Sequence, residues 1–172
     1  PKLIPELHHR ASQWYEQNGY IEPAIDHAVL GDDHERAAML VEQAAETVLM
    51  RGELVTLSTW LDALPQETQH ERPLLSLYRA AALLLNGQPP AKIRPFLRAA
   101  ATAQNDPADQ GTAVLRALLS LWQGDVAQSV ALGRQVLDSL PEQNLFWRGT
   151  VTANLGIAYL YDGRGLDLAE QM

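Results

Sequence analysis

Apolar residues recur along this chain at intervals of three and four, the spacing of one face of an α-helix. The clearest run is Ala37, Val41, Ala45 and Val48. Similar runs precede residues 19 and 87, and another covers residues 151–159. The pattern predicts a chain built of amphipathic helices.

Five glycines interrupt these helical runs at similar intervals. They are Gly19, Gly52, Gly87, Gly124 and Gly163, separated by 33, 35, 37 and 39 residues. Glycine ends helices because it adopts the left-handed conformation at little cost. A second helical run follows each glycine, and a helix–turn–helix unit of about 34 residues is typical of tetratricopeptide repeats.

We therefore predict an all-α fold, a right-handed superhelical array of about five antiparallel helix pairs. One tetratricopeptide-like segment spans residues 1–172, with pairs at approximately 5–31, 32–65, 73–104, 107–140 and 144–172. A single pair cannot bury its own apolar face, so stacked pairs are expected to share one continuous core.

Helix-boundary residues support these divisions. Asp32 stands three residues before Glu35, which predicts a capping box with Asp32 as the N-cap. Asp106 before Pro107 is typical of an N-cap followed by proline in the first turn. In the last repeat, we expect Gly156 to let two helices approach closely.

The two ends of the sequence suggest a segment of a longer protein. It begins at Pro1 without an initiator methionine and stops at Met172 within a helical pattern. No signal peptide is recognisable, and the longest uncharged stretch, residues 149–161, is too short for a bilayer span. We expect a cytoplasmic protein that does not contact membranes.

The amino-acid composition favours helices and excludes some classes of site and partner. The chain has 24 Ala and 28 Leu but only 14 Ile and Val together, which disfavours a β-protein. It has no cysteine, so disulfides and thiolate sites are excluded. Its net charge of −8 argues against direct binding of nucleic acid by this segment.

The first 90 or so residues carry a family resemblance in several ordered segments. These are residues 7–19 (LHHRASQWYEQNG), 24–28 (AIDHA), 35–38 (ERAA), 51–65 (RGELVTLSTWLDALP), 72–74 (RPL) and 83–87 (LLLNG). Together they resemble the region that follows the NTPase and winged-helix portion of MalT-like activators, the large ATP-dependent LuxR-family regulators of bacteria. The remaining residues resemble tetratricopeptide repeats in general.

The resemblance implies a modular transcriptional regulator. Members of the family join an ATP-binding switch to a helical-repeat sensor and a DNA-binding helix-turn-helix. This chain has neither a phosphate-binding loop nor a recognisable helix-turn-helix, so ATP hydrolysis and DNA binding are expected elsewhere in the parent protein.

Catalytic and metal-binding patterns are missing from the sequence. The histidines, His8, His9, His27, His34 and His70, lack the spacing of a zinc site. The serines lack the Gly-x-Ser-x-Gly elbow of hydrolases. We therefore expect a non-enzymatic segment with no cofactor, although an acidic or histidine-based all-α enzyme stays as a third hypothesis.

Ligand binding is expected on the first helix of each pair, which lines the concave groove of such repeats. The candidate groove residues are Tyr78, Arg148, Asn154 and Tyr161, with Glu42, Glu46 and Leu77 as further candidates. Asn154 is placed to hold a ligand backbone, and Tyr78 to stack on a flat ligand. Alternatively, both tyrosines fill the core and Asn154 is solvated. We expect Trp14, Trp60 and Trp122 in the core.

The leading hypothesis is a segment that senses a small molecule, peptide or protein in its groove. Binding would be relayed to the ATPase switch and the DNA-binding domain of a MalT-like regulator. The alternative is a standalone tetratricopeptide-type scaffold for protein–protein interaction.

Overall fold

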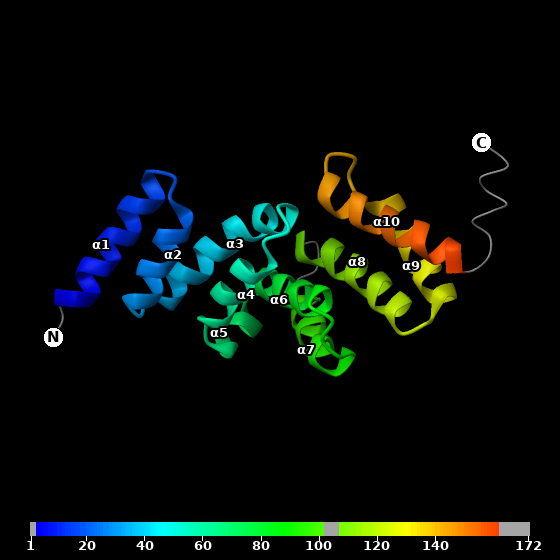
Figure 1. Ribbon diagram of the computed structural model, residues 1–172, viewed down its shortest axis with the longest axis horizontal. Coiled ribbons are helices and arrows are strands. Elements are labelled where there is room, and N and C mark those ends of the chain that lie inside the picture. Colours follow the sequence, from blue (N-terminus) through cyan, green and yellow to red (C-terminus); the bar gives the residue numbers. More distant parts are fainter. Residues whose placement is uncertain (1–2, 102–106, 162–172) are drawn as a thin grey trace.

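The computed structural model describes residues 3–101 and 107–161, and these residues are helical without any strand. The all-α prediction is thereby confirmed for the described part of the chain. Figure 1 shows an elongated arrangement with α1 at one end and α9 and α10 at the other. The helices are α1 (Leu3–Gln17), α2 (Ile21–Leu30), α3 (His34–Met50), α4 (Leu54–Asp62), α5 (Gln66–Glu71), α6 (Pro73–Leu85), α7 (Pro90–Ala100), α8 (Pro107–Trp122), α9 (Val126–Ser139) and α10 (Leu145–Tyr161).

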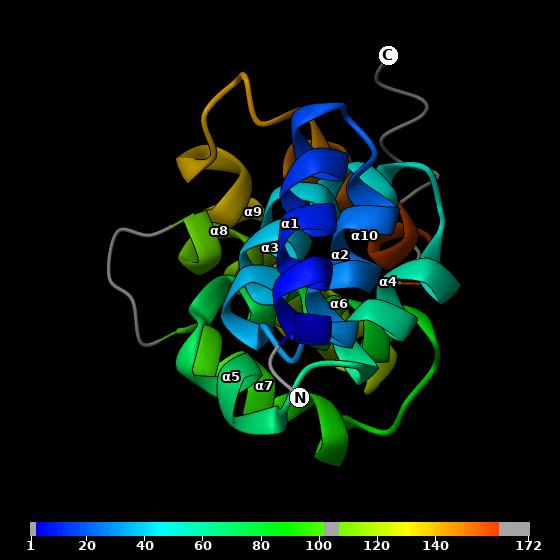
Figure 2. The ribbon, with the colours of Figure 1, turned by 90° about the vertical axis from the view of Figure 1, so that its left-hand side faces the viewer.

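Neighbouring helices pack as pairs. The pairs are α1 with α2, α3 with α4, α6 with α7, and α8 with α9. The first helices of successive pairs also touch, since α3 contacts α6, α6 contacts α8, and α8 contacts α10. In Figure 2, viewed from the end where α1 lies, the later helices line up behind it. The helix expected after α10 lies outside the described residues.

Helix α5 was not predicted. It occupies Gln66–Glu71, between the second and third pairs, and its sequence lacks an apolar stripe. The side chain of Gln69 is buried there, where its Nε2 donates to the carbonyls of Leu61 and Leu64. A short polar helix held by such bonds leaves no periodic signal.

The turns follow the glycine prediction in all four places that the structure describes. Gly19, Gly52, Gly87 and Gly124 have φ values between 68° and 81°, which only glycine adopts at little cost. Gly163 lies outside the described residues. These four turns separate the two helices of each pair.

The predicted N-cap of α3 was wrong by one residue. Asp33, not Asp32, is the cap, and its Oδ1 accepts a hydrogen bond of 3.1 Å from the backbone N–H of Arg36. Asp32 instead has a φ of 60° and occupies the left-handed position that ends α2. Pro107 begins α8 as expected, while Asp106 lies outside the described residues.

Three helices pack closely at Gly111 of α8. A Cβ atom on Gly111 of α8 would lie 2.6 Å from Leu77 Cδ2 of α6 and 2.8 Å from Trp147 Cζ2 of α10. A Cβ on Gly156 would have no described atom within 4 Å. Gly111 therefore brings three first helices together, whereas the helix that Gly156 is expected to approach lies outside the described residues.

The prediction that three tryptophans lie in the core is confirmed for one of them. Trp60 is buried in the core as expected, but Trp14 and Trp122 are each 55% exposed, so their assignment to the core was wrong. Trp14 lies beside Tyr15 and Tyr20 at the edge of the first pair. Trp122 lies in the last turn of α8. Helical periodicity marks an apolar face but does not say whether that face meets the core or an open surface.

No helix within residues 3–101 and 107–161 combines the length and the hydrophobicity that a bilayer span requires.

Candidate functional site

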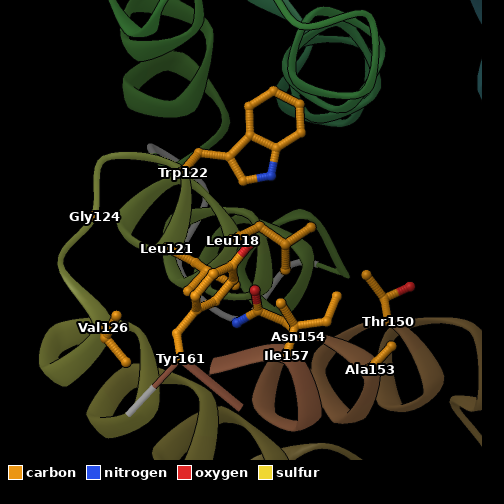
Figure 3. Close-up of a pocket in the computed structure, with 10 residues that line it drawn as sticks. All are labelled: Leu118, Leu121, Trp122, Gly124, Val126, Thr150, Ala153, Asn154, Ile157 and Tyr161. Carbon is orange, nitrogen blue, oxygen red and sulfur yellow. The ribbon is translucent and has the colours of Figure 1, made fainter. Parts of the chain in front are cut away.

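A groove of about 720 Å³ lies between α8, the turn into α9, and α10 (Figure 3). We call it the α8–α10 groove. None of its lining residues is charged, and most of them are apolar. They are Leu118, Leu121, Trp122, Gly124, Val126, Thr150, Ala153, Asn154, Ile157 and Tyr161.

The α10 wall of the groove follows from helical spacing. Thr150, Asn154, Ile157 and Tyr161 are separated by four, three and four residues, so they lie along one face of the helix. A second face of α10, which includes Val151, is buried in the core. Because α10 is apolar on both faces, it joins the core and also presents apolar surface to the groove.

Asn154 is the most constrained polar residue of the groove. The hydroxyl of Ser129 in α9 donates its one hydrogen to the carbonyl of Ala117 in α8, at 2.9 Å. It can therefore only accept from Asn154, whose Nδ2 donates to Ser129 Oγ at 2.9 Å. The side-chain amide is fixed in this orientation, which leaves Oδ1 for the groove.

The environment of Asn154 Oδ1 makes it available to a ligand. The residue is only 5% exposed, yet its Oδ1 has no hydrogen-bond partner among the described residues. Figure 3 shows the amide among the lining side chains, between the Leu118 side and the α10 backbone. A ligand that donates a hydrogen bond to this oxygen would replace the water that the open groove admits.

Thr150 adds a second acceptor to the same wall. Its hydroxyl donates to the carbonyl of Phe146 at 2.8 Å within α10. Since a threonine hydroxyl has only one hydrogen, this oxygen can take part in any further hydrogen bond only as an acceptor. Both fixed polar atoms of the α10 wall thus accept hydrogen bonds.

Two aromatic side chains stand at the rim. Trp122 is 55% exposed at the end of α8, and Tyr161 is 75% exposed at the end of α10. Figure 3 shows the indole on the α8 side and the phenol rising from the last turn of α10. Large exposed aromatic groups beside an apolar groove are typical of binding surfaces.

Of the four main candidates, Asn154 and Tyr161 line this groove, whereas Tyr78 and Arg148 do not. Tyr78 of α6 is buried, and burial raises the pKa of its phenol, with the charges of Glu46 and Glu42 adding to the rise. Arg148 is half-buried, and its Nη1 donates to the carbonyls of Leu137 and Leu140 at the end of α9.

The further candidates lie away from the groove. Leu77 is fully buried, and Glu42 takes part in an ion-pair network with Arg72 and Glu35. Burial alone would lower the pKa of Arg72, but the hydrogen bond to Glu35 and the charges of both glutamates raise it. This network joins α3 to the start of α6, which is a structural arrangement.

Several groove residues were missed by the sequence reasoning, although the glycine register contains a signal for them. Trp122 stands two residues before Gly124, and Tyr161 stands two before Gly163. Leu118 and Ile157 both stand six residues before the same glycines. Aligning each first helix on its glycine would have selected Leu118, Trp122 and Ile157 together with Tyr161.

The histidines are in pairwise contacts. His8 Nδ1 lies 2.8 Å from His27 Nδ1, and His9 Nδ1 lies 2.8 Å from Asp33 Oδ2. His34 pairs with Asp32, and His70 Nδ1 lies near the Gln66 carbonyl. Within the described ranges, no group of three or more histidine or acidic residues is arranged to hold a metal ion.

Comparison with known proteins gives distant relatives. The chain is 28% identical over 178 aligned residues to the HTH-type transcriptional regulator MalT of Yersinia enterocolitica, covering 98% of this chain and 20% of that protein. It is 37% identical over 86 residues to the serine/threonine-protein kinase PknK of Mycobacterium tuberculosis and of Mycobacterium bovis, covering 50% of this chain and 8% of the kinase.

The chain therefore spans at most about a fifth of the length of these relatives. No protein-family model matches it, and no solved structure matches it. The similarity to MalT extends over nearly the whole chain and agrees with the resemblance seen in the sequence.

Proposed function

We propose that this chain is the tetratricopeptide-like, non-catalytic sensor segment of a MalT-like transcriptional regulator. The α8–α10 groove would bind its effector, and other domains of a cytoplasmic parent protein would bind ATP and DNA. The observation that carries the proposal is the uncharged, largely apolar groove with a buried, oriented Asn154 acceptor, in a chain similar to MalT along nearly its whole length.

The helix contacts support a repeat array. Contacts from α3 to α6 to α8 to α10 are those expected when the first helices of stacked pairs line one surface, as in a right-handed superhelix. Binding across α8 and α10 would stabilise one relative position of two repeats. A ligand that prefers one arrangement shifts the population toward it, which is how such a segment would signal to a switch domain.

A thermal-shift screen of the 172-residue chain tests groove binding. The screen uses neutral oligosaccharides, capped peptides and nucleotides, and each hit is repeated on Trp122→Ala and on Trp14→Ala. The two tryptophans are equally exposed, but only Trp122 lines the groove. A compound at 100 times its Kd stabilises the fold by about 2.7 kcal/mol, which gives a clear rise in Tm.

We expect at least one class of compound to raise the Tm of the unaltered chain and of Trp14→Ala, but not of Trp122→Ala. Hits that shift all three proteins equally would place binding outside the groove. If no compound shifts the Tm and the chain instead purifies with a stable protein partner, the scaffold function replaces the sensor function.

A further inference from the structure

A second groove, separate from the α8–α10 groove, is lined by three arginines and by no acidic residue. It has a volume of about 430 Å³ and lies between α7, α8 and α9. We call it the α7–α9 groove. Its lining residues are Arg94, Leu97, Arg98, Arg116, Leu119, Ser120, Gln123, Gln128 and Leu132. None of these residues lines the α8–α10 groove, although both grooves use α8.

Helical spacing places charge and apolar surface together in the α7–α9 groove. Arg94, Leu97 and Arg98 share one face of α7, because they are three and four residues apart. Leu97 and Leu119 are buried whereas the arginines are exposed, so the apolar surface lies deeper than the charges. We call Leu97, Leu119 and Leu132 the leucine floor.

Two arginines of this groove lack the partners that other arginines of the chain have. Arg36, Arg72 and Arg79 each form an ion pair with a carboxylate. The guanidinium groups of Arg94 and Arg116 have no hydrogen-bond or ion-pair partner within residues 3–101 and 107–161. This positive charge gathers in a chain that has 13 Lys and Arg against 21 Asp and Glu.

Helix stability explains only one of the three arginines. Arg98 lies in the last turn of α7, where a positive charge is favourable, and its Nε donates to the carbonyl of Arg94. Arg94 and Arg116 lie inside their helices, away from the ends. Like charges four residues apart on a helix repel each other, as Arg94 and Arg98 do. An anion beside them would replace this repulsion with attraction.

The remaining polar groups of the groove also suit an anion. The side-chain amides of Gln123 and Gln128 are exposed, and neither has a hydrogen-bond partner in the described part of the chain. The hydroxyl hydrogen of Ser120 is donated to the carbonyl of Arg116 at 3.0 Å. The nearby carboxylate of Asp125 caps α9 by accepting from the Gln128 backbone N–H, and it does not line the groove.

The charge and shape of the groove select a class of anion. Arginine binds oxyanions through paired N–H groups, and a phosphate monoester offers three acceptor oxygens and a charge of about −1.5 to −2 at pH 7. A carboxylate offers a single charge to the same three arginines. The leucine floor favours an anion that also has an apolar body. The volume is within the range of about 300–1,000 Å³ that is usual for small-molecule sites.

We propose that the α7–α9 groove binds a small phosphate monoester with an apolar body. The phosphate contacts the three arginines, and the body packs on the leucine floor. This second site goes beyond the proposed function, because it lies outside the effector groove and takes a ligand of different chemistry.

Isothermal titration calorimetry on the 172-residue chain tests the proposal, with phenyl phosphate as the probe. Inorganic phosphate lacks the apolar body, benzoate lacks the second charge, and phenol is uncharged. We expect phenyl phosphate to bind in a saturable manner, inorganic phosphate and benzoate to bind about tenfold more weakly, and phenol not to bind. Added salt should weaken the binding of phenyl phosphate, because its contacts are charged and exposed.

Single substitutions then locate the site. Arg94→Gln and Arg116→Gln each remove a positive charge from the groove and should weaken phenyl phosphate about tenfold. Arg10→Gln is the matched control, since Arg10 is an exposed arginine of α1 and its loss changes the net charge equally. It should leave the Kd unchanged. Because all three side chains are exposed, the variants should fold, which circular dichroism checks.

Four results would overturn the proposal. Equal binding of benzoate or phenol would show that the groove does not select phosphate. Equal binding of inorganic phosphate would show that the leucine floor is not used. Equal weakening by Arg10→Gln would attribute the effect to the net charge of the chain. The absence of saturable binding by phenyl phosphate at up to about 10 mM would exclude the site.

Trp122→Ala separates this inference from the proposed function. Trp122 lines the α8–α10 groove alone, so its substitution should leave the Kd of phenyl phosphate unchanged. Binding that is lost in Trp122→Ala but kept in both arginine variants would place the anion in the α8–α10 groove, and this inference would be wrong while the effector groove stands. If no effector binds in a manner that depends on Trp122, the arginine variants still decide the second site.

Discussion

At the residue scale, the adjacent residues Asp32 and Asp33 before α3 have different structural roles. Asp33 accepts one hydrogen bond from the Arg36 N–H, and its other oxygen lies 2.8 Å from His9 Nδ1, so it joins the cap of α3 to α1. Asp32 has a φ of 60° and a largely exposed side chain that pairs with His34. The side chain matters at position 33, and the backbone conformation matters at position 32.

This difference predicts opposite responses to substitution. Asp33→Ala should lower the free energy of unfolding by about 1 kcal/mol, because an N–H of the first turn of α3 loses its acceptor. Asp32→Gly should leave it unchanged or raise it, because glycine adopts a positive φ without strain. Urea unfolding followed by circular dichroism measures both. A larger loss of unfolding free energy for Asp32→Gly than for Asp33→Ala would support Asp32 as the N-cap, as the sequence predicted.

At the element scale, Gly111 sets how closely α8 passes α6 and α10. The space for a methyl group is already filled by Leu77 and by the indole of Trp147. Gly149 of α10 is the opposite case, since a Cβ there would meet nothing within 4 Å among the described atoms. The two glycines lie in helices but differ in their surroundings.

Gly111→Ala should therefore destabilise the protein by about 1–3 kcal/mol through overpacking. Gly149→Ala should stabilise it by about 0.5–1 kcal/mol, because alanine favours the helical conformation in an exposed position. Chemical denaturation of both variants gives the comparison. Stabilisation by both substitutions would show that Leu77 and Trp147 can move aside.

The burial of Tyr78 in α6 predicts that the free energy of unfolding depends on pH. Burial raises the pKa of Tyr78 above the value of about 10 that it has in the unfolded chain. Its stabilising contribution is therefore complete below pH 10 and falls as the pH rises above 10, because the unfolded chain then loses the phenol proton more readily.

Tyr78→Phe should remove this part of the alkaline loss, so its free energy of unfolding should fall less steeply between pH 10 and pH 11 than that of the unaltered chain. Tyr161→Phe is the control, because Tyr161 is exposed. Urea titrations at both pH values measure the slopes. Equal slopes for the unaltered chain and Tyr78→Phe would exclude a role for the Tyr78 phenol.

At the scale of the whole molecule, contacts run mainly between neighbours along the chain. In an array of this kind, stability is close to a sum of local terms, and a local defect should stay local. Leu40 of α3 and Leu115 of α8 are both buried, in different pairs. They provide matched sites for testing how far destabilisation spreads.

Leu115→Ala should cost about 2–5 kcal/mol locally and increase hydrogen exchange chiefly in α6–α10. Leu40→Ala should do so chiefly in α2–α6. Hydrogen exchange followed by mass spectrometry on peptides from both variants gives the two profiles. Identical, uniform increases along the chain would indicate one cooperative unit instead of a repeat array.

Features with a local cause could be predicted from the sequence, whereas those that depend on distant partners could not. Apolar spacing and the glycine turns need only neighbouring residues, and they located most of the helices. Helix α5 depends on Gln69 reaching the Leu61 and Leu64 carbonyls, which no spacing reveals. Likewise, Trp122 lies on an apolar stripe that meets the groove, and only the packing of α8 on α10 shows this.

The hydrogen-bond chain from Asn154 through Ser129 to the Ala117 carbonyl has a consequence for how ligand preference could change in evolution. Three helices jointly set which side of one amide faces the groove. Loss of the Ser129 hydroxyl would free that amide to rotate and present its NH₂ group instead of its oxygen. A single substitution at Ser129, which does not line the groove, would thus replace a hydrogen-bond acceptor in the groove with a donor. Related proteins could in this way acquire new effectors without a change in any residue that contacts them.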